Sequence, residues 1–142
     1  EKYFNKGFYL LNSISIYDAK YKGSNGIEKN TAFNGGYIVN ILAGKEIKLS
    51  TKNTLALDAK ITTAGGRRYT PINISSSALQ GREIREFNKS FDLQFKPYFR
   101  TDFKVTFRRN GKKISQEWFI DMQNITNHQN VFAQSYDNKN KK

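Results

Sequence analysis

The feature that most constrains this chain is a two-residue alternation between residues 98 and 108. One set of side chains there is mostly apolar and the intervening set is mostly charged: Phe99, Thr101, Phe103, Val105 and Phe107 against Arg100, Asp102, Lys104, Thr106 and Arg108. Successive side chains of a β-strand point to opposite faces, so this period predicts a strand with one apolar and one polar face. No segment has the spacing of a useful amphipathic helix.

Four further segments alternate in the same way, and the connections between segments differ in length. We expect strands at about 7–17, 37–49, 53–64, 98–108 and 114–124. Short turns at 4–7, 50–52 and 109–112 alternate with long connections at 18–36 and 65–97. The predicted fold class is all-β, an antiparallel meander of about five strands. A soluble antiparallel sandwich gives the same alternation, whereas short turns alternating with long loops are typical of a transmembrane β-barrel.

The Asn110-Gly111 dipeptide predicts a specific hairpin between the last two strands. Asn-Gly favours a two-residue turn, because both residues tolerate positive φ. Centred there, the register pairs Phe99 with Met122, Arg100 with Asp121, Phe103 with Trp118, Lys104 with Glu117 and Val105 with Gln116. Cross-strand pairs of this kind contribute roughly 0.2–1 kcal/mol each.

Charge and composition narrow the class of protein. The chain has 24 Lys and Arg against 12 Asp and Glu, a net charge of +12. This charge fits binding to nucleic acid, to a phosphate-bearing membrane surface or to an anionic ligand, and it equally fits a well-solvated surface. With one His and no Cys it is poorly equipped for nucleophilic catalysis. His128 lies in an Asn-rich stretch and is expected to be an exposed loop residue, and no spacing suggests metal ligands. We therefore expect no catalytic residue, cofactor or metal.

Specific stretches resemble a known family. The segment YFRTDFKVTFRRNGKKISQEWFIDMQNITNHQNVFAQSYD at 98–137, with YDAKYKGSNG, NTAFNGGYIVNILAGKE and AGGRRYTPI before it, strongly resembles TonB-dependent outer-membrane receptors of the Bacteroidetes type. These often carry an N-terminal carboxypeptidase-regulatory-like domain. The resemblance implies residues 1–142 are a segment of the C-terminal transmembrane barrel, which has about 22 strands when complete. We expect a fragment, because the family's plug, energy-coupling box and terminal aromatic strand are not found in the sequence.

The resemblance also implies a role and a location. Such receptors lie in the outer membrane of Gram-negative bacteria and import a scarce ligand with energy supplied through TonB. The expected partners are outer-membrane lipid and lipopolysaccharide, the rest of the barrel and its plug, the energy-coupling complex reached through the N-terminal part, and an unidentified imported ligand.

In a barrel the two faces would meet different surroundings. We expect lipid to contact the apolar side chains Leu55, Leu57, Phe99, Phe103, Phe107, Trp118, Ile120 and Met122. The lumen would be lined by ion pairs among Asp58, Lys60, Arg100, Asp102, Lys104, Glu117 and Asp121. Each carboxylate has a basic neighbour close in sequence or across the predicted hairpin, which favours ion pairing over acid–base chemistry.

Basic residues also crowd the long connection at 65–97. Arg67, Arg68, Arg82 and Arg85 are candidates for contact with lipopolysaccharide phosphates or an anionic ligand, although a solvated loop is the simpler interpretation. The alternative function is a soluble basic β-sheet module that binds nucleic acid or another anionic ligand. We expect no nucleic acid, because aromatic and charged residues lie on opposite faces instead of sharing one stacking surface.

Overall fold

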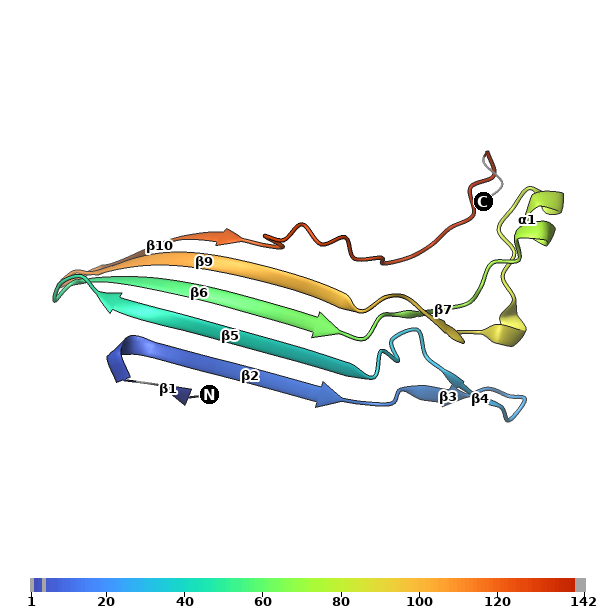
Figure 1. Cartoon of the computed structure of the whole chain (residues 1–142), viewed down its shortest axis with the longest axis horizontal. Helices are drawn as coiled ribbons and strands as arrows, with labels where there is room; N and C mark the ends of the chain where they lie inside the picture. The colour runs from blue at the N-terminus through green and yellow to red at the C-terminus, as the bar shows by residue number, and fades with distance from the viewer. Residues whose placement is uncertain (1, 4, 140–142) are drawn as a thin grey trace. The chain divides into compact units, whose positions relative to one another are not determined.

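A six-stranded antiparallel sheet is the main feature of the computed structural model, which describes residues 2–3 and 5–139 (Figure 1). The strand order is β1-β2-β5-β6-β9-β10. The strands are β1 Lys2–Tyr3, β2 Phe8–Ile16, β5 Tyr37–Lys48, β6 Asn53–Ala64, β9 Tyr98–Asn110 and β10 Ser115–Met122. The predicted all-β antiparallel fold class is confirmed, and β1 lies where the sequence indicates the end of a further strand, ahead of the five expected ones.

The sheet has no hydrophobic core of its own. No hydrophobic side chain in the described part of the chain is buried. All eight residues of β10 are exposed, including Trp118 at 52%, Ile120 at 67% and Met122 at 44%. A soluble sheet normally covers its apolar face with a second layer. In the residues described, that apolar surface stays accessible.

The register between β9 and β10 differs from the predicted one. The observed partners are Phe103 with Met122, Lys104 with Asp121, Val105 with Ile120, Phe107 with Trp118 and Arg108 with Glu117. Phe103 thus faces Met122 instead of Trp118, a shift of four residues along β10 (122 − 118). The predicted pairs Lys104–Glu117, Arg100–Asp121, Phe99–Met122 and Val105–Gln116 are wrong. An even shift leaves each side chain on its predicted face, and Val105 gains an apolar partner.

The turn explains the shift. A two-residue type I′ turn requires positive φ at both central residues, but neither Asn110 nor Gly111 has positive φ. Asn110 instead ends β9, and its N–H donates to the Lys52 carbonyl oxygen at 2.7 Å. The hairpin turns through residues 111–114, where the N–H of Gly111 donates to the Ile114 carbonyl oxygen at 2.9 Å. Contact with the neighbouring β5–β6 turn outweighs the local preference of Asn-Gly.

The long connections contain ordered structure of their own. Residues 16–37, 64–98 and 130–139 belong to a second compact unit. Its elements are β3 Lys20–Lys22, β4 Glu28–Asn30, β7 Arg68–Tyr69, α1 Ile74–Gln80, η2 Phe87–Lys89 and β8 Leu93–Gln94. β3 pairs with β4 and β7 with β8, both antiparallel. Elements of two to seven residues are too short to show a period, so the sequence pattern did not reveal them.

The short helix α1 has recognisable ends. Asn73 is its N-cap, and the side-chain oxygen of Asn73 accepts from the N–H of Ser76 at 2.9 Å. Gly81 ends the helix with φ of 64°, which a glycine adopts without steric cost. No helix in the part of the chain that the structure describes combines the length and hydropathy needed to cross a membrane.

Candidate functional site

The polar face of the sheet gathers most of the predicted lumen-lining residues. A hollow of about 430 Å³ is lined by Asp58, Lys60, Arg100, Asp102, Lys104 and Asp121, together with Tyr9, Leu42 and Gln123. The seventh predicted residue, Glu117, lies in β10 opposite Arg108. Alternation along β2, β5, β6, β9 and β10 brings the lining residues to one face, because each strand presents every second residue there.

Ion pairs and hydrogen bonds occupy the carboxylates of this hollow. Asp102, only 9% exposed, accepts from Arg100 at 2.8 Å and from the N–H of Asn124 at 3.0 Å. Asp58 accepts a hydrogen bond from the Tyr9 hydroxyl. Carboxylates engaged in this way make charge-assisted contacts that stabilise the polar face of the sheet.

Arg108 lies close to two carboxylates, and the predicted register did not include these contacts. Its guanidinium lies 2.9 Å from a Glu117 carboxylate oxygen and 3.8 Å from one of Glu46. The sequence placed Arg108 on the polar face, but the predicted register paired Glu117 with Lys104 instead. Lys104 actually faces Asp121, and its ammonium also lies 4.3 Å from the centroid of the Phe119 ring.

Tyr9 and Gly44 form another contact that the alternation did not single out. Gly44 is buried, and a Cβ added there would collide with the Tyr9 ring and the Asp58 carboxylate. The aromatic ring therefore crosses the glycine of β5 to reach β6. A cross-strand aromatic residue covering a strand glycine is a recurring arrangement. A Tyr in one predicted strand and a Gly in the next were the sequence features that could have indicated this contact.

The opposite face of the sheet is apolar. A hollow of about 490 Å³ includes Phe8, Leu10, Ala43, Leu57, Ala59 and Phe103 among its lining residues. Phe107 stacks on Trp118 with ring centroids 5.9 Å apart, and Phe103 is the direct partner of Met122. The other predicted lipid-facing residues, Leu55, Phe99 and Ile120, share this face by the alternation of their strands.

Three of the four candidate loop arginines lie together. A small cavity of about 150 Å³ is lined in part by Arg67, Arg68 and Arg85, but not by Arg82. Arg68 donates from Nε to the Asn34 carbonyl oxygen at 3.0 Å and from Nη1 to the Asp92 carbonyl oxygen at 3.2 Å. Its donors thus bind main-chain oxygens from two different connections.

Arg67 and Arg82 have different surroundings. The Arg67 guanidinium lies 4.8 Å from the Phe33 ring centroid and 4.4 Å from that of Phe132. Such cation–π contacts hold the charge against aromatic faces. Arg82 donates to the side-chain oxygen of Gln80 at 3.1 Å and is exposed.

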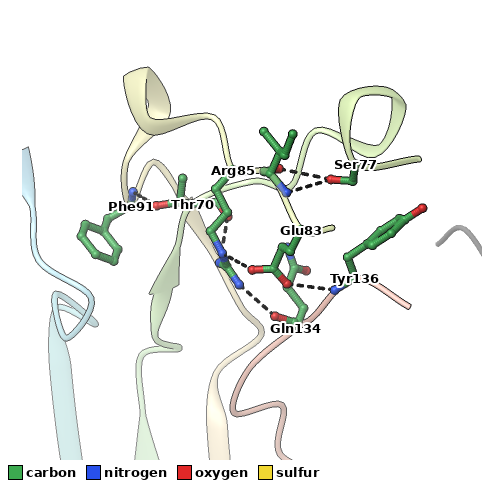
Figure 2. Close-up of polar contacts among 8 residues, drawn as sticks. Thr70, Ser77, Glu83, Arg85, Phe91, Gln134 and Tyr136 are labelled. Carbon is green, nitrogen blue, oxygen red and sulfur yellow. Dashed lines mark hydrogen bonds and ion pairs between the residues drawn. The ribbon is translucent and has the colours of Figure 1, made fainter. Parts of the chain in front are cut away.

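Arg85 connects the loop at 65–97 to the segment after β10. Its guanidinium lies 2.6 Å from a Glu83 carboxylate oxygen and donates to the carbonyl oxygens of Thr70 at 3.3 Å and Gln134 at 3.1 Å. Figure 2 draws these contacts. Glu83 in turn accepts from the N–H of Tyr136 at 2.9 Å. This backbone hydrogen bond, with a smaller effect of Arg85, lowers the pKa of Glu83 below its ordinary value.

His128, the chain's single histidine, lies in the segment that follows β10. His128 is exposed; its ring lies edge-on to Phe99 with centroids 5.7 Å apart, and its N–H donates to the Asn124 side chain at 3.1 Å. Within residues 2–3 and 5–139, no group of three His, Asp or Glu side chains is arranged to hold a metal ion. The arrangement can form a charged wall and an apolar surface.

Comparisons with protein-family models, with curated proteins and with solved structures each gave no match to this chain.

Proposed function

We propose that the chain forms part of the wall of a transmembrane β-barrel, belonging to a TonB-dependent receptor that imports a ligand across the outer membrane. In this proposal the apolar face of the sheet contacts lipid and the polar face lines the lumen. The long connections are extracellular and the short turns are periplasmic. The receptor class follows from the resemblance of residues 98–137 and the preceding segments to that family.

The observation that carries the proposal is an uncovered apolar face on an otherwise regular sheet. Its aromatic and aliphatic side chains, including Trp118, Ile120 and Met122, stay about half to two-thirds exposed. Contiguous apolar surface of this kind indicates a membrane or protein contact. Strands that alternate apolar-out and polar-in are the pattern of membrane barrels.

The connections support the same proposal. The three short turns all lie at one end of the sheet, whereas the long connections leave from the other end (Figure 1). The long connections are held by side chains that bind main-chain oxygens, such as Arg68 and Arg85. Barrels of this class combine tight turns on one side with structured loops on the other.

A second candidate function has one observation in its favour. Phe119 lies on the polar face with Lys104 over its ring, and Tyr9 lies on the same face. Mixed aromatic and basic side chains can stack and neutralise a single-stranded nucleic acid. A soluble basic binding module therefore remains the competing proposal to be separated by experiment.

The lipid contact can be tested with the chain's single tryptophan. Trp118 is on the apolar face and the adjacent Phe119 is on the polar face. We expect Trp118 fluorescence to be quenched when the chain is refolded into vesicles of lipids brominated along their acyl chains. The matched control is the swap Trp118→Phe with Phe119→Trp, which moves the fluorophore to the other face and should escape quenching. Equal quenching of both proteins, or none in the natural chain, would reject the assignment of faces.

The import role needs a cellular test. Deleting the gene for the complete protein should abolish growth on one limiting nutrient, and restoring the gene should recover it. Unchanged uptake of every nutrient offered, together with sequence-preferring nucleic-acid binding by the chain, would favour the competing module.

A further inference from the structure

The three short turns of the sheet carry only one sign of charge. Segments 5–7, 48–53 and 109–114 contain no Asp or Glu. They contain six basic residues, all exposed, which we call the basic rim: Lys6, Lys48, Lys52, Arg109, Lys112 and Lys113. The charge of this end is therefore positive at every turn.

Main-chain contacts place these turns beside one another. The first turn lies against β5, because a Cβ added at Gly7 would collide with the Glu46 carbonyl oxygen. The second and third turns are joined by the 2.7 Å hydrogen bond from the Asn110 N–H to the Lys52 carbonyl oxygen. The basic rim thus extends along one end of the sheet.

Nearby carboxylates do not neutralise the basic rim. Glu46 and Glu117 both lie beside Arg108, at 3.8 and 2.9 Å. Among the described residues, no ion pair involves a member of the basic rim. Six unpaired like charges at one end of a sheet attract an anionic partner.

The basic rim borders the apolar face. Phe8, Trp118 and Ile114, at this end, are 45%, 52% and 71% exposed. Lys45 lies on the apolar side near the first turn, with its ammonium 4.4 Å from the Phe8 ring centroid. This cation–π contact adds a further positive charge beside the apolar face at this end of the sheet.

We propose that the basic rim binds the headgroups of anionic phospholipids at the membrane surface bordering the short turns. This inference rests on the proposed barrel function. The position of the charges favours lipid over nucleic acid, because they lie at the end of an apolar face and not among the aromatics of the polar face. Tryptophan and basic residues at the boundary of an apolar band anchor proteins at the headgroup level.

The test measures partitioning of the refolded chain onto two kinds of vesicle. One kind is phosphatidylcholine alone, and the other is phosphatidylcholine mixed with phosphatidylglycerol. Basic residues near an anionic surface each contribute about fivefold to binding. The triple variant Arg109→Gln, Lys112→Gln, Lys113→Gln should therefore lose on the order of 100-fold in partitioning onto the anionic vesicles. Its partitioning onto phosphatidylcholine should not change.

The matched control is the triple variant Lys22→Gln, Lys96→Gln, Lys139→Gln. It removes the same net charge from exposed residues of the second unit and should retain most of the anionic preference. Equal losses in both triple variants, or no preference of the natural chain for phosphatidylglycerol, would overturn the proposal for the basic rim. Binding to phosphatidylcholine without such a preference would leave the barrel function intact. Failure to bind either vesicle would reject both proposals.

A folding control keeps the result interpretable. Far-ultraviolet circular dichroism should show the same strand content in both triple variants. If the first variant does not refold, Lys6→Gln with Lys48→Gln and Lys52→Gln neutralises the other half of the basic rim. That variant should lose a similar factor, and an unchanged anionic preference would overturn the proposal.

Discussion

Replacing Gly44 with alanine should separate Tyr9 from Asp58 and destabilise the sheet. In the structure the Tyr9 ring passes over Gly44, and its hydroxyl donates to the Asp58 carboxylate. An alanine methyl would occupy the space of that ring, so Tyr9 would have to rotate away. Both side chains are half-buried, which gives their hydrogen bond a measurable effect.

The size of the effect follows from three contributions. A hydrogen bond to a charged group contributes about 1.5–3 kcal/mol when buried, and about 1–2 kcal/mol is appropriate for this half-buried pair. Displacing the ring from the β5 backbone costs about 1 kcal/mol more in apolar contact. Alanine recovers roughly 0.5–1 kcal/mol, because glycine weakens a strand. The Gly44→Ala variant should therefore lose about 1–2.5 kcal/mol of unfolding free energy.

Urea unfolding in detergent micelles, followed by circular dichroism, measures this loss. Tyr9→Phe removes the same hydrogen bond and should cost about 1–2 kcal/mol. The double variant with Gly44→Ala should cost about 1 kcal/mol less than the sum, because the two changes remove one shared interaction. Ala43→Val adds bulk at the next position of β5 on the other face and serves as the control. Strict additivity, or an unchanged stability of Gly44→Ala, would refute the Tyr9–Asp58 contact as the reason for the glycine.

Two further predictions concern the second unit. Ser77→Ala should cost about 1–3 kcal/mol of unfolding free energy in the same urea assay, because the fully buried Ser77 hydroxyl accepts from the N–H of Ile84 at 2.9 Å. The control Ser75→Ala, on the exposed side of α1, should cost under about 0.5 kcal/mol. Equal costs would contradict the buried hydrogen bond. Because the pKa of Glu83 is lowered, its stabilising contact with the Tyr136 N–H is intact above the ordinary glutamate pKa and is lost as pH falls through the lowered value. Hydrogen exchange of the Tyr136 amide should accelerate over that acid range by more than its intrinsic pH dependence. If a Glu83→Gln variant showed the same acceleration, protonation of Glu83 would be excluded as the cause.

The sequence was sufficient for the strands and their faces. Alternation places Phe103 and Arg100 on opposite sides, and the structure keeps that division, with Phe103 beside Met122 and Arg100 beside Asp102. The side of a residue depends only on the parity of its position in a strand, which is a local property. The polar hollow, whose lining comes from five strands, therefore contains six of the seven residues selected by alternation.

The register could not be obtained from local preference. Asn110-Gly111 favours a two-residue turn in isolation, yet the Asn110 N–H binds Lys52, which lies far away in sequence. The observed register, shifted by four residues along β10, also pairs opposite charges: Arg108 lies opposite Glu117, and Lys104 lies opposite Asp121. Complementary charges repeat along these strands, and their pattern fits more than one even shift.

The long connections were the least predictable part. Strands of two or three residues have no measurable period, and α1 spans only seven residues. The contacts that organise them, such as Arg68 with Asn34, join residues whose proximity depends on the complete fold. Arginine clustering at 65–97 was visible in the sequence, but the acceptors of these arginines were not.

Those acceptors have a consequence for how the loops can vary. Arg68 and Arg85 bind carbonyl oxygens of the backbone, including those of Asp92, Thr70 and Gln134. Every amino acid supplies a carbonyl oxygen, so these contacts impose no side-chain identity on the positions that accept them; Glu83, which pairs with Arg85 through its carboxylate, is the exception. Surface residues of the loops can therefore be exchanged, by evolution or by design, while the two arginines preserve the path of the chain. A library that randomises exposed loop positions and leaves these arginines in place would sample new recognition surfaces on an unchanged loop backbone.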